Sequence, residues 1–480
     1  MLNSRRQFFR RALGSAGLMA GATALAARAE PSLASSQHPH GLSPPASPSV
    51  ERAKPAGDFL PVETPDLPKL SYTLENGVKV FNLVAEPVKR EFVPRRTLNL
   101  WGYNGTAPGP TIEVVQGDRV RLIVDNHLPE PTSMHWHGFE IPIDMDGVEG
   151  ISQPLIPPGG RFVYEFTLHQ AGTFFYHSHM AMQEMMGLLG LFIMHPREAV
   201  SPAVDRDFGL ILQEWAVLPS NTVPNSMAME FNWLTLNGKS GPATTPLIAK
   251  LGHRVRIRLV NLGMDHHPIH LHGNTFYVTG TEAGRVPEAA WTPTNTVLVG
   301  VAQARDIEFD AKYPGDWMLH CHMPHHMMNQ MASMVGPMLE SGRGLKTGMG
   351  MPEGMGMPQQ GGATDEVNGP SLGRSIGIGA EHEKATTNAP LEGQPPAQPM
   401  KMPGMTSMSH GPATDPWQVP GYPQDMAMAM SMPMKEAEAK PETYGLAPGW
   451  SAGMMGMMTL MRVLPPALYD DVMARIKARG

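Results

Sequence analysis

Residues 111–124 read TIEVVQGDRVRLIV, and this stretch decides the fold class. Two short runs of alternating apolar and polar residues flank Gly117 and Asp118, which is the pattern of two strands joined by a turn. Similar runs, broken by glycine, proline and asparagine, continue from Val78. No convincing long amphipathic helix interrupts them before the C-terminal region. We therefore predict an all-β protein made of Greek-key β-sandwiches.

The strand pattern occurs twice in the chain. The residues GDRVRL that begin at Gly117 recur as GHRVRI from Gly252, and each copy is followed at the same spacing by a histidine, His135 or His270. Such internal similarity at a fixed spacing indicates a duplicated structural unit. We expect two copies of one sandwich domain, over residues 67–200 and 201–340.

The N-terminal residues differ in composition from the predicted domains. Residues 1–29 carry SRRQFF, an apolar stretch too short to span a bilayer, and a small-x-small cleavage site. This resembles a twin-arginine signal peptide, with an ordinary Sec signal as the alternative. Residues 30–66, rich in proline, serine and alanine, predict a flexible leader. We expect a bacterial protein that is exported to the periplasm or secreted.

The C-terminal residues 341–480 are rich in methionine and hold 19 of the 38 methionines. Runs such as GMGM and MAMAM lack the pattern of a buried core, so we predict a disordered low-complexity tail. Only the end, from about Met454 to Arg479, has the spacing of an amphipathic helix.

Charge and cysteine content narrow the function classes. The net charge of −7 includes no basic run, so neither nucleic acid nor an anionic membrane is expected as a partner. The single cysteine, Cys321, cannot form a disulfide within the chain. Its thiol is therefore available for chemistry.

Four short motifs each place two histidines one residue apart. They are His135-Trp136-His137, His177-Ser178-His179, His270-Leu271-His272 and His320-Cys321-His322. On a strand, side chains at i and i+2 share a face, so each motif offers two imidazoles in one direction. One such pair alone is more often a surface pair or a zinc fragment, but four pairs in a tandem repeat predict a metal cluster.

The thiol of Cys321 has a ligand set of its own. Because it lies between His320 and His322, its side chain points away from theirs on a strand. His326 and Met331 follow it by five and ten residues, and His267 lies three residues before His270, where the third motif begins. A thiolate with two imidazoles and a weak axial thioether is the blue-copper electron-transfer site.

These motifs resemble the four copper-binding motifs of the multicopper oxidases over about residues 75–340. The resemblance implies four copper ions per functional unit: one type 1, one type 2 and two type 3. It assigns the type 1 ion to His267, Cys321, His326 and Met331, and the type 2 ion to His135 and His270. It assigns the type 3 ions to His137, His177 and His322, and to His179, His272 and His320.

The spacing of the motifs leaves no room for a middle domain between His179 and His267. The chain is thus similar to the two-domain laccases, whose type 1 site lies in domain 2, and domain 1 has Ser178 where domain 2 has Cys321. In that subgroup the cluster histidines come from neighbouring subunits of a closed ring. The resemblance therefore implies a homotrimer.

The implied reaction is the one-electron oxidation of a small reducing substrate, a phenol, Cu(I) or another metal ion, at type 1 copper. Electrons would pass through Cys321 to His320 and His322, and O₂ would be reduced to water at the cluster. Asp146 resembles the acidic residue that the family keeps near the cluster. The alternative interpretation of Asp146 is a turn residue before a glycine.

Other functions share part of this pattern. The methionine-rich tail could gather cuprous ions, which favours a periplasmic copper-resistance protein acting as cuprous oxidase or copper carrier. A carrier would not explain Cys321 between two cluster histidines. A copper nitrite reductase has the sandwich pair and the type 1 site, but it does not need four paired-histidine motifs.

Overall fold

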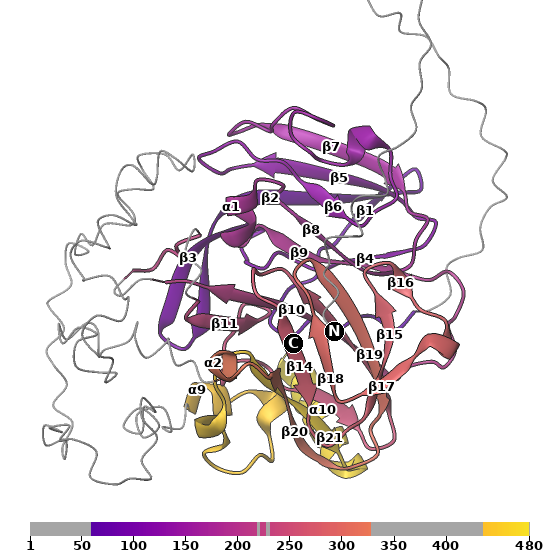
Figure 1. The fold of residues 1–480 in the computed structure, drawn as a ribbon, viewed down its shortest axis with the longest axis vertical. Coiled ribbons are helices and arrows are strands. Elements are labelled where there is room, and N and C mark those ends of the chain that lie inside the picture. Colours follow the sequence, from indigo (N-terminus) through magenta and orange to yellow (C-terminus); the bar gives the residue numbers. More distant parts are fainter. Residues whose placement is uncertain (1–58, 218–220, 227–230, 328–434, 480) are drawn as a thin grey trace, which may run out of the picture. The chain divides into compact units, whose positions relative to one another are not determined.

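The computed structural model describes residues 59–217, 221–226, 231–327 and 435–479. Strands dominate this part of the chain, and the helices are short except for the last one (Figure 1). The all-β prediction is confirmed. Among the described residues, no helix is long and apolar enough to cross a membrane.

Domain 1 is a sandwich of two sheets. The first sheet has the order β1 (Thr73–Glu75), β2 (Val78–Val93), β5 (Arg119–Asn126) and β7 (Arg161–Thr167), with β3 (Arg96–Tyr103) paired to β2. The second has the order β4 (Ile112–Val115), β9 (Leu189–His195), β8 (Gly172–His177) and β6 (His135–His137). Alternate residues of β5, namely Val120, Leu122 and Val124, point into the shared core, as the period of a strand requires.

Domain 2 repeats this architecture with a larger first sheet. That sheet has the order β11 (Trp233–Leu236), β10 (Arg206–Trp215), β13 (Arg254–Asn261), β19 (Gln303–Asp310), β15 (Phe276–Thr281) and β16 (Gly284–Arg285), with β17 (Thr292–Thr294) paired to β15. The second has the order β12 (Leu247–Lys250), β21 (Met458–Leu464), β20 (Gly315–Cys321), β14 (His267–Leu271) and β18 (Thr296–Val299). Both sheets contribute to one apolar core.

The predicted low-complexity tail is wrong for residues 435–479. Strand β21 (Met458–Leu464) is buried along its whole length between β12 and β20, so it is an interior part of domain 2. The predicted helix begins later than expected, as α10 (Pro466–Arg479), because the residues before it are buried on both faces and form a central strand. The sequence conceals this because the partner strands lie far away along the chain. Residues 341–434 lie outside the described residues.

The predicted leader also ends earlier than expected. Val62 is fully buried, and Glu63 forms a bridge to Phe208 at the edge of domain 2. Residues 59–66 therefore belong to the fold, whereas the predicted signal peptide and the rest of the leader lie outside the described residues.

Short helical segments connect the strands. Within the described part of the chain, the α-helices besides α10 are α1 (Ala181–Met185), α2 (Pro324–Met327) and α9 (Lys435–Glu438). The 3₁₀ segments are η2 (Ile143–Met145), η3 (Glu288–Ala290), η5 (Pro441–Thr443) and η6 (Trp450–Gly453). Of these, α1 and α2 matter for function, because each follows a paired-histidine motif.

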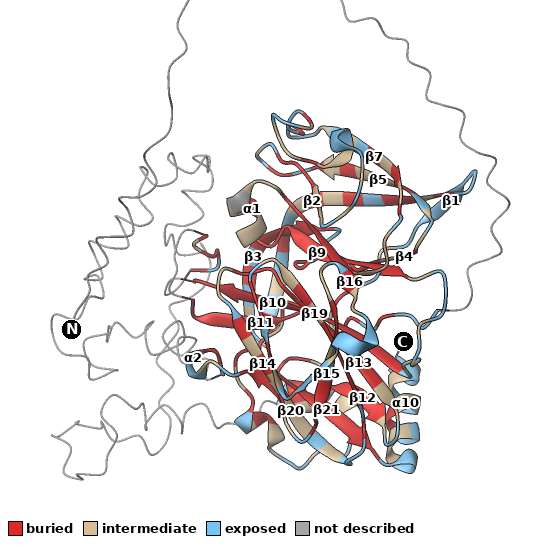
Figure 2. Ribbon diagram, turned by 45° about the vertical axis from the view of Figure 1, so that its right-hand side comes forward, coloured by how far each residue is buried: buried red, intermediate tan, exposed pale blue. Residues whose placement is uncertain are grey.

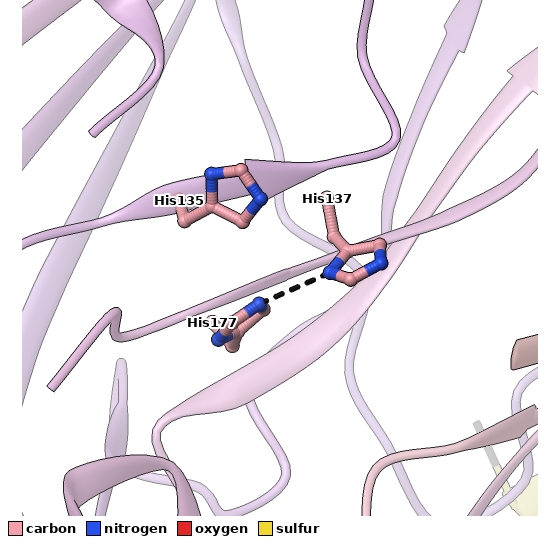
Figure 3. Close-up of side chains that lie close together, drawn as sticks. All are labelled: His135, His137 and His177. Carbon is pink, nitrogen blue, oxygen red and sulfur yellow. Dashed lines mark hydrogen bonds between the residues drawn. The ribbon is translucent and has the colours of Figure 1, made fainter. Parts of the chain in front are cut away.

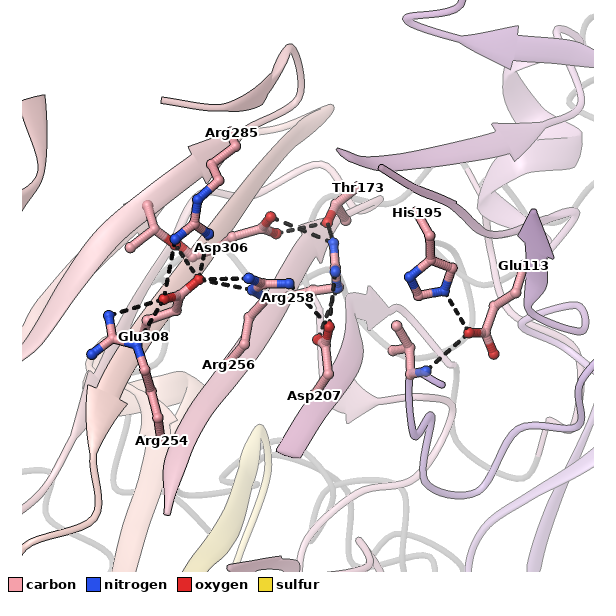
Figure 4. A network of polar contacts seen from close by, with 12 residues as sticks. Glu113, Thr173, His195, Asp207, Arg254, Arg256, Arg258, Arg285, Asp306 and Glu308 are labelled. Atoms are coloured by element: carbon pink, nitrogen blue, oxygen red, sulfur yellow. Dashed lines mark hydrogen bonds and ion pairs between the residues drawn. The ribbon is translucent and has the colours of Figure 1, made fainter. Parts of the chain in front are cut away.

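The two domains share a buried boundary. Buried residues follow β9, β10 and β11 through the interior (Figure 2). An apolar cluster there joins Leu191 of domain 1 to Ile211 and Val260 of domain 2. Beside it, Arg258 donates to Thr173 Oγ1 at 2.7 Å and pairs with Asp207 at 2.8 Å (Figure 4). Such buried charges are tolerated because each has a partner.

Candidate metal centres

A thiol and two imidazoles meet at one end of domain 2. Strand β20 ends at Cys321, β14 begins at His267, and these two strands are paired, while His326 lies in α2. Cys321 Sγ is 3.7 Å from His267 Nδ1 and 3.4 Å from His326 Nδ1. All three residues are buried, and their donor atoms lie within 4.8 Å of one another. Met331, the predicted fourth ligand, lies outside the described residues.

Carboxylates hold the far side of both imidazoles. Glu214, on β10 and with a fully buried side chain, accepts from His267 Nε2 at 3.0 Å. Its other oxygen accepts the backbone N–H groups of Met264 and, at 2.8 Å, Asp265. Asp265 Oδ2 lies 3.5 Å from His326 Nε2. Because a carboxylate lies at Nε2 of each ring, Nδ1 of each ring faces Cys321. Hydrogen-bond partners of this kind orient the ligands of a metal site.

The thiol itself is not activated by its surroundings. Burial raises the pKa of Cys321 to about 12, because a low-dielectric environment disfavours the thiolate. A bound metal ion would have to displace the thiol proton.

The four histidines of domain 1 form a quartet on β6, at the end of β8 and just after it. His137 Nδ1 lies 3.3 Å from His177 Nε2, with His135 beside them (Figure 3). The His135 ring centroid is 5.5 Å from that of His137, 5.3 Å from that of His177 and 5.6 Å from that of His179. The donor atoms of His135, His137 and His177 lie within 4.8 Å of one another, which suits a shared metal ion.

The four histidines of domain 2 form a matching quartet at the ends of β14 and β20 and just after them. His272 Nε2 and His320 Nε2 are 3.0 Å apart. The His270 ring centroid lies 4.8 Å from that of His272, 5.6 Å from that of His320 and 5.5 Å from that of His322. Among the ring contacts of the described residues, none joins this quartet to the one in domain 1.

Burial keeps part of both quartets neutral. It lowers the pKa of His137 to about 4 and that of His177 to about 3. The pKa values of His272 and His320 are also lowered, again chiefly by burial. Neutral imidazole is the form that binds metal ions.

Asp146 lies beside the domain 1 quartet, as the sequence suggested. His135 Nδ1 donates to the Asp146 carbonyl oxygen at 2.8 Å, and the Asp146 carboxylate is 3.6 Å from the same nitrogen. Gly147 has φ +85°, and a Cβ there would lie 1.7 Å from the Met134 carbonyl oxygen, so the turn needs glycine. Asp146 is thus both a turn residue and a neighbour of a predicted ligand.

Sequence reasoning missed two further carboxylates at this quartet. Glu149 Oε2 is 2.9 Å from His179 Nδ1, and Glu184 Oε2 is 3.3 Å from His177 Nδ1. Burial raises the pKa of Glu184 to about 7. Both residues lie on the segments that follow a motif, but nothing in their spacing distinguishes them from other surface acids. Glu214 could have been singled out from the sequence, because it is the one acid in the apolar run FGLILQEW and a buried acid needs a partner.

Comparison with known proteins agrees with this geometry. Two multicopper oxidase family models match residues 85–199 and 216–337. The chain is 44% identical over 112 residues to copper resistance protein A of Escherichia coli, covering 23% of this chain and 18% of that protein. It is 30% identical over 240 residues to multicopper oxidase MmcO of Mycobacterium tuberculosis, covering 43% and 46%.

One solved structure is similar over about half of this chain. The blue copper oxidase from Nitrosomonas europaea is 30% identical in sequence with a TM-score of 0.49, and the match covers 52% of this chain and 80% of that one. The matched region spans less than half the length of the curated relatives. The chain belongs to the multicopper oxidase family. Its two β-sandwich domains are cupredoxin-like. Membership implies copper as the metal.

Proposed function

We propose that the chain is a laccase-like oxidoreductase that couples one-electron oxidation of a small reducing substrate to reduction of O₂ to water. One observation carries this proposal. Cys321 faces two buried imidazoles at 3.4 and 3.7 Å, while its neighbours His320 and His322 belong to the histidine quartet. A single tripeptide thus joins a mononuclear site to a cluster.

The donor set fits copper. A buried thiol with two imidazole Nδ1 atoms is a soft site that excludes hard ions. His267, Cys321 and His326 would hold the type 1 ion, and the two quartets would hold the type 2 and type 3 ions with the division that the family resemblance implies. Copper bound there would supply the one-electron chemistry. Sequence spacing alone names Met331 as the axial ligand.

The protein residues would position the ligands and manage protons. Glu214 and Asp265 fix the rings of His267 and His326, and Glu149 fixes His179. Reduction of O₂ consumes protons, and Asp146, beside His135, is our candidate for the acid near the cluster.

We also propose that the cluster is completed between subunits of a homotrimer. In support, the ring contacts of each quartet stay within its own domain. Each chain would then offer two half-clusters, and each half would be completed by the opposite quartet of a neighbouring subunit. Sedimentation of the copper-loaded protein should give the mass of a trimer. A monomer with full copper content and full activity would contradict this assembly.

A second candidate function is cuprous oxidation or copper carriage in copper resistance. It is favoured by the match to a copper resistance protein and by the methionine-rich region of the sequence. Export by the twin-arginine route to the periplasm would suit either function. No nucleic-acid partner is proposed.

Oxygen uptake by the copper-loaded full chain separates these functions. We expect O₂ consumption without release of hydrogen peroxide when a phenol, Cu(I) or Mn(II) is supplied in parallel assays. The substrate that gives the highest kcat/KM identifies the reductant. Stoichiometric copper binding with no O₂ uptake on any substrate would leave only the carrier.

A further inference from the structure

Two hydrogen bonds define the residue that lies opposite Cys321. The Cys321 N–H donates to the Met457 carbonyl at 3.0 Å, and the Met457 N–H donates to the His326 carbonyl at 3.1 Å. Met457 directly precedes β21, in which Met458 pairs with His320 of β20. The next position of this antiparallel register places Met457 across from Cys321. Its backbone therefore binds Cys321 and His326, two of the three residues that carry the candidate type 1 donors.

Domain 1 contains the same arrangement in a shorter form. The Ser178 N–H donates to the Leu188 carbonyl at 2.9 Å, and the Leu188 N–H donates to the Gln183 carbonyl at 3.2 Å. Leu188 directly precedes β9, in which Leu189 pairs with His177. Leu188 therefore holds the place in domain 1 that Met457 holds in domain 2.

The strands that follow these two residues also correspond. Strand β9 pairs in parallel with β4 and antiparallel with β8, and β21 pairs in parallel with β12 and antiparallel with β20. In domain 1 only residues 184–187 separate Gln183 from Leu188. In domain 2 residues 327–456 stand between His326 and Met457. The methionine-rich region is thus an insertion in the ligand loop, not an appendage after the domain.

The Met457 side chain lies on the same face of the sheet as the thiol. Met457, Met461 and Val463 belong to the core cluster that contains Cys321, and Met457 is fully buried. Met458 and Leu460 belong to the cluster on the other face. Residues directly opposite in an antiparallel pair have Cβ atoms about 5 Å apart. A methionine side chain has three rotatable bonds, so the Met457 sulfur can approach the donor atoms around Cys321.

We propose that Met457, rather than Met331, supplies the thioether ligand of the type 1 copper. This inference rests on the proposed function, because it assigns one more donor to the same site. Thioether sulfur is the weak axial donor that completes a site of two imidazoles and a thiolate. The C-terminal segment would then close the copper site as well as the domain 2 sheet.

The test compares single variants of the copper-loaded full chain. The variants are Met457→Leu, Met457→Gln, Met331→Leu and Met458→Leu. The readouts are the midpoint reduction potential and the visible and EPR spectra of type 1 copper. Leucine has about the volume of methionine, so M457L tests the sulfur more than the packing.

We expect M457L to raise the potential and M457Q to lower it, since losing a ligand favours Cu(I) and a harder oxygen ligand favours Cu(II). Both should change the spectra, whereas M331L and M458L should leave potential and spectra at the wild-type values. A purely structural role would not shift the potential in opposite directions.

A shift in M331L with none in M457L would overturn the inference and leave the proposed function intact. Shifts of the same sign in M457L and M457Q would also overturn it. A wild-type protein without any thiolate-to-copper absorption band would instead overturn the proposed function, and the inference with it.

Discussion

Domain 1 and domain 2 place different chemistry at the same three backbone positions. Domain 1 has Thr132, Ser178 and Gln183 where domain 2 has His267, Cys321 and His326. In domain 1 the hydroxyls of Thr132 and Ser178 donate to Gln183 Oε1 at 2.7 and 2.9 Å and lie 3.2 Å apart. The Gln183 amide N–H₂ donates to the Pro131 carbonyl at 2.8 Å, so this polar triad of side chains is hydrogen-bonded without a metal ion. The scaffold therefore fixes where the site is, and three side chains decide whether it is a polar contact or a copper site.

The repeated arginines show a second difference. Arg121 pairs with Glu165 on an accessible face of domain 1, and in the same register of domain 2 Arg256 pairs with Glu308, whose side chain is fully buried. In domain 2 the pair belongs to a network with Asp207, and Arg258 on the same strand extends this network to Thr173 of domain 1 (Figure 4). The same local sequence thus gives a solvated pair in one domain and an interface network in the other.

The largest expected effect follows from making domain 2 resemble domain 1. Cys321→Ser should abolish the thiolate-to-copper absorption band and type 1 copper, because a serine hydroxyl is not a soft anionic ligand. Visible absorption and copper content measure this. The matched control is Ser178→Ala, which should keep the band. Retention of the band in C321S would show that the type 1 site lies elsewhere.

Removing the buried carboxylate should cost more than removing its accessible counterpart. We expect Glu308→Gln to reduce the free energy of unfolding by about 3–5 kcal/mol, because it removes the buried carboxylate that Arg254, Arg256 and Arg285 share. Glu165→Gln should cost about 1 kcal/mol or less. Urea denaturation at neutral pH measures both values. Equal losses would contradict the difference in burial.

The stabilisation by Glu308 should depend on pH. Burial alone would raise the pKa of Glu308, but hydrogen bonding from Arg285 and the charge of Arg256 outweigh it and hold the pKa at about 2. Because the folded pKa lies below the unfolded value of about 4.3, this stabilisation is present above that value and is lost as the pH falls toward 2. Stability of E308Q should fall less over that window than stability of the wild type.

An intermediate effect is expected at the ring of His267. Glu214→Gln puts an amide N–H₂ against either the His267 ring or the backbone N–H groups of Met264 and Asp265, all of which are donors. We expect copper affinity at the type 1 site to fall by about 10–100-fold. Competition with a chelator measures it. Asp265→Asn, at a more accessible carboxylate, should lower affinity less. The reverse order would contradict the role given to Glu214.

The smallest effect concerns the polar triad. Thr132→Val removes one donor to Gln183 Oε1 in a buried setting and should cost about 1–3 kcal/mol of unfolding free energy. The type 1 band and its potential should not change. Loss of the band would contradict this prediction and would mean that Thr132, Ser178 and Gln183 also support the type 1 site.

The sequence predicts the parts of the site that lie within local motifs. Paired histidines on strands, Cys321 between two of them, and His267 and His326 at short spacing follow from strand periodicity and ligand chemistry. The repeat also contains Thr132 and Gln183, so their correspondence to His267 and His326 could have been found by aligning the two halves.

The remaining features depend on contacts between distant segments. Strand β21 joins its sheet across the long methionine-rich region, and Glu214 reaches His267 from a strand of the other sheet. No local pattern encodes such pairings. A buried acid in an apolar strand marks Glu214 as unusual, but only the fold shows which imidazole it meets.

Reoxidation of the type 1 copper tests most directly whether the two quartets serve one O₂-reducing cluster. The copper-loaded wild type and the double variant H137A/H177A are first bleached with substrate under anaerobic conditions, and O₂ is then admitted. We predict that the absorption band returns in the wild type and stays bleached in the variant, whose type 1 site is intact. Return of the band at the wild-type rate in H137A/H177A would contradict the account.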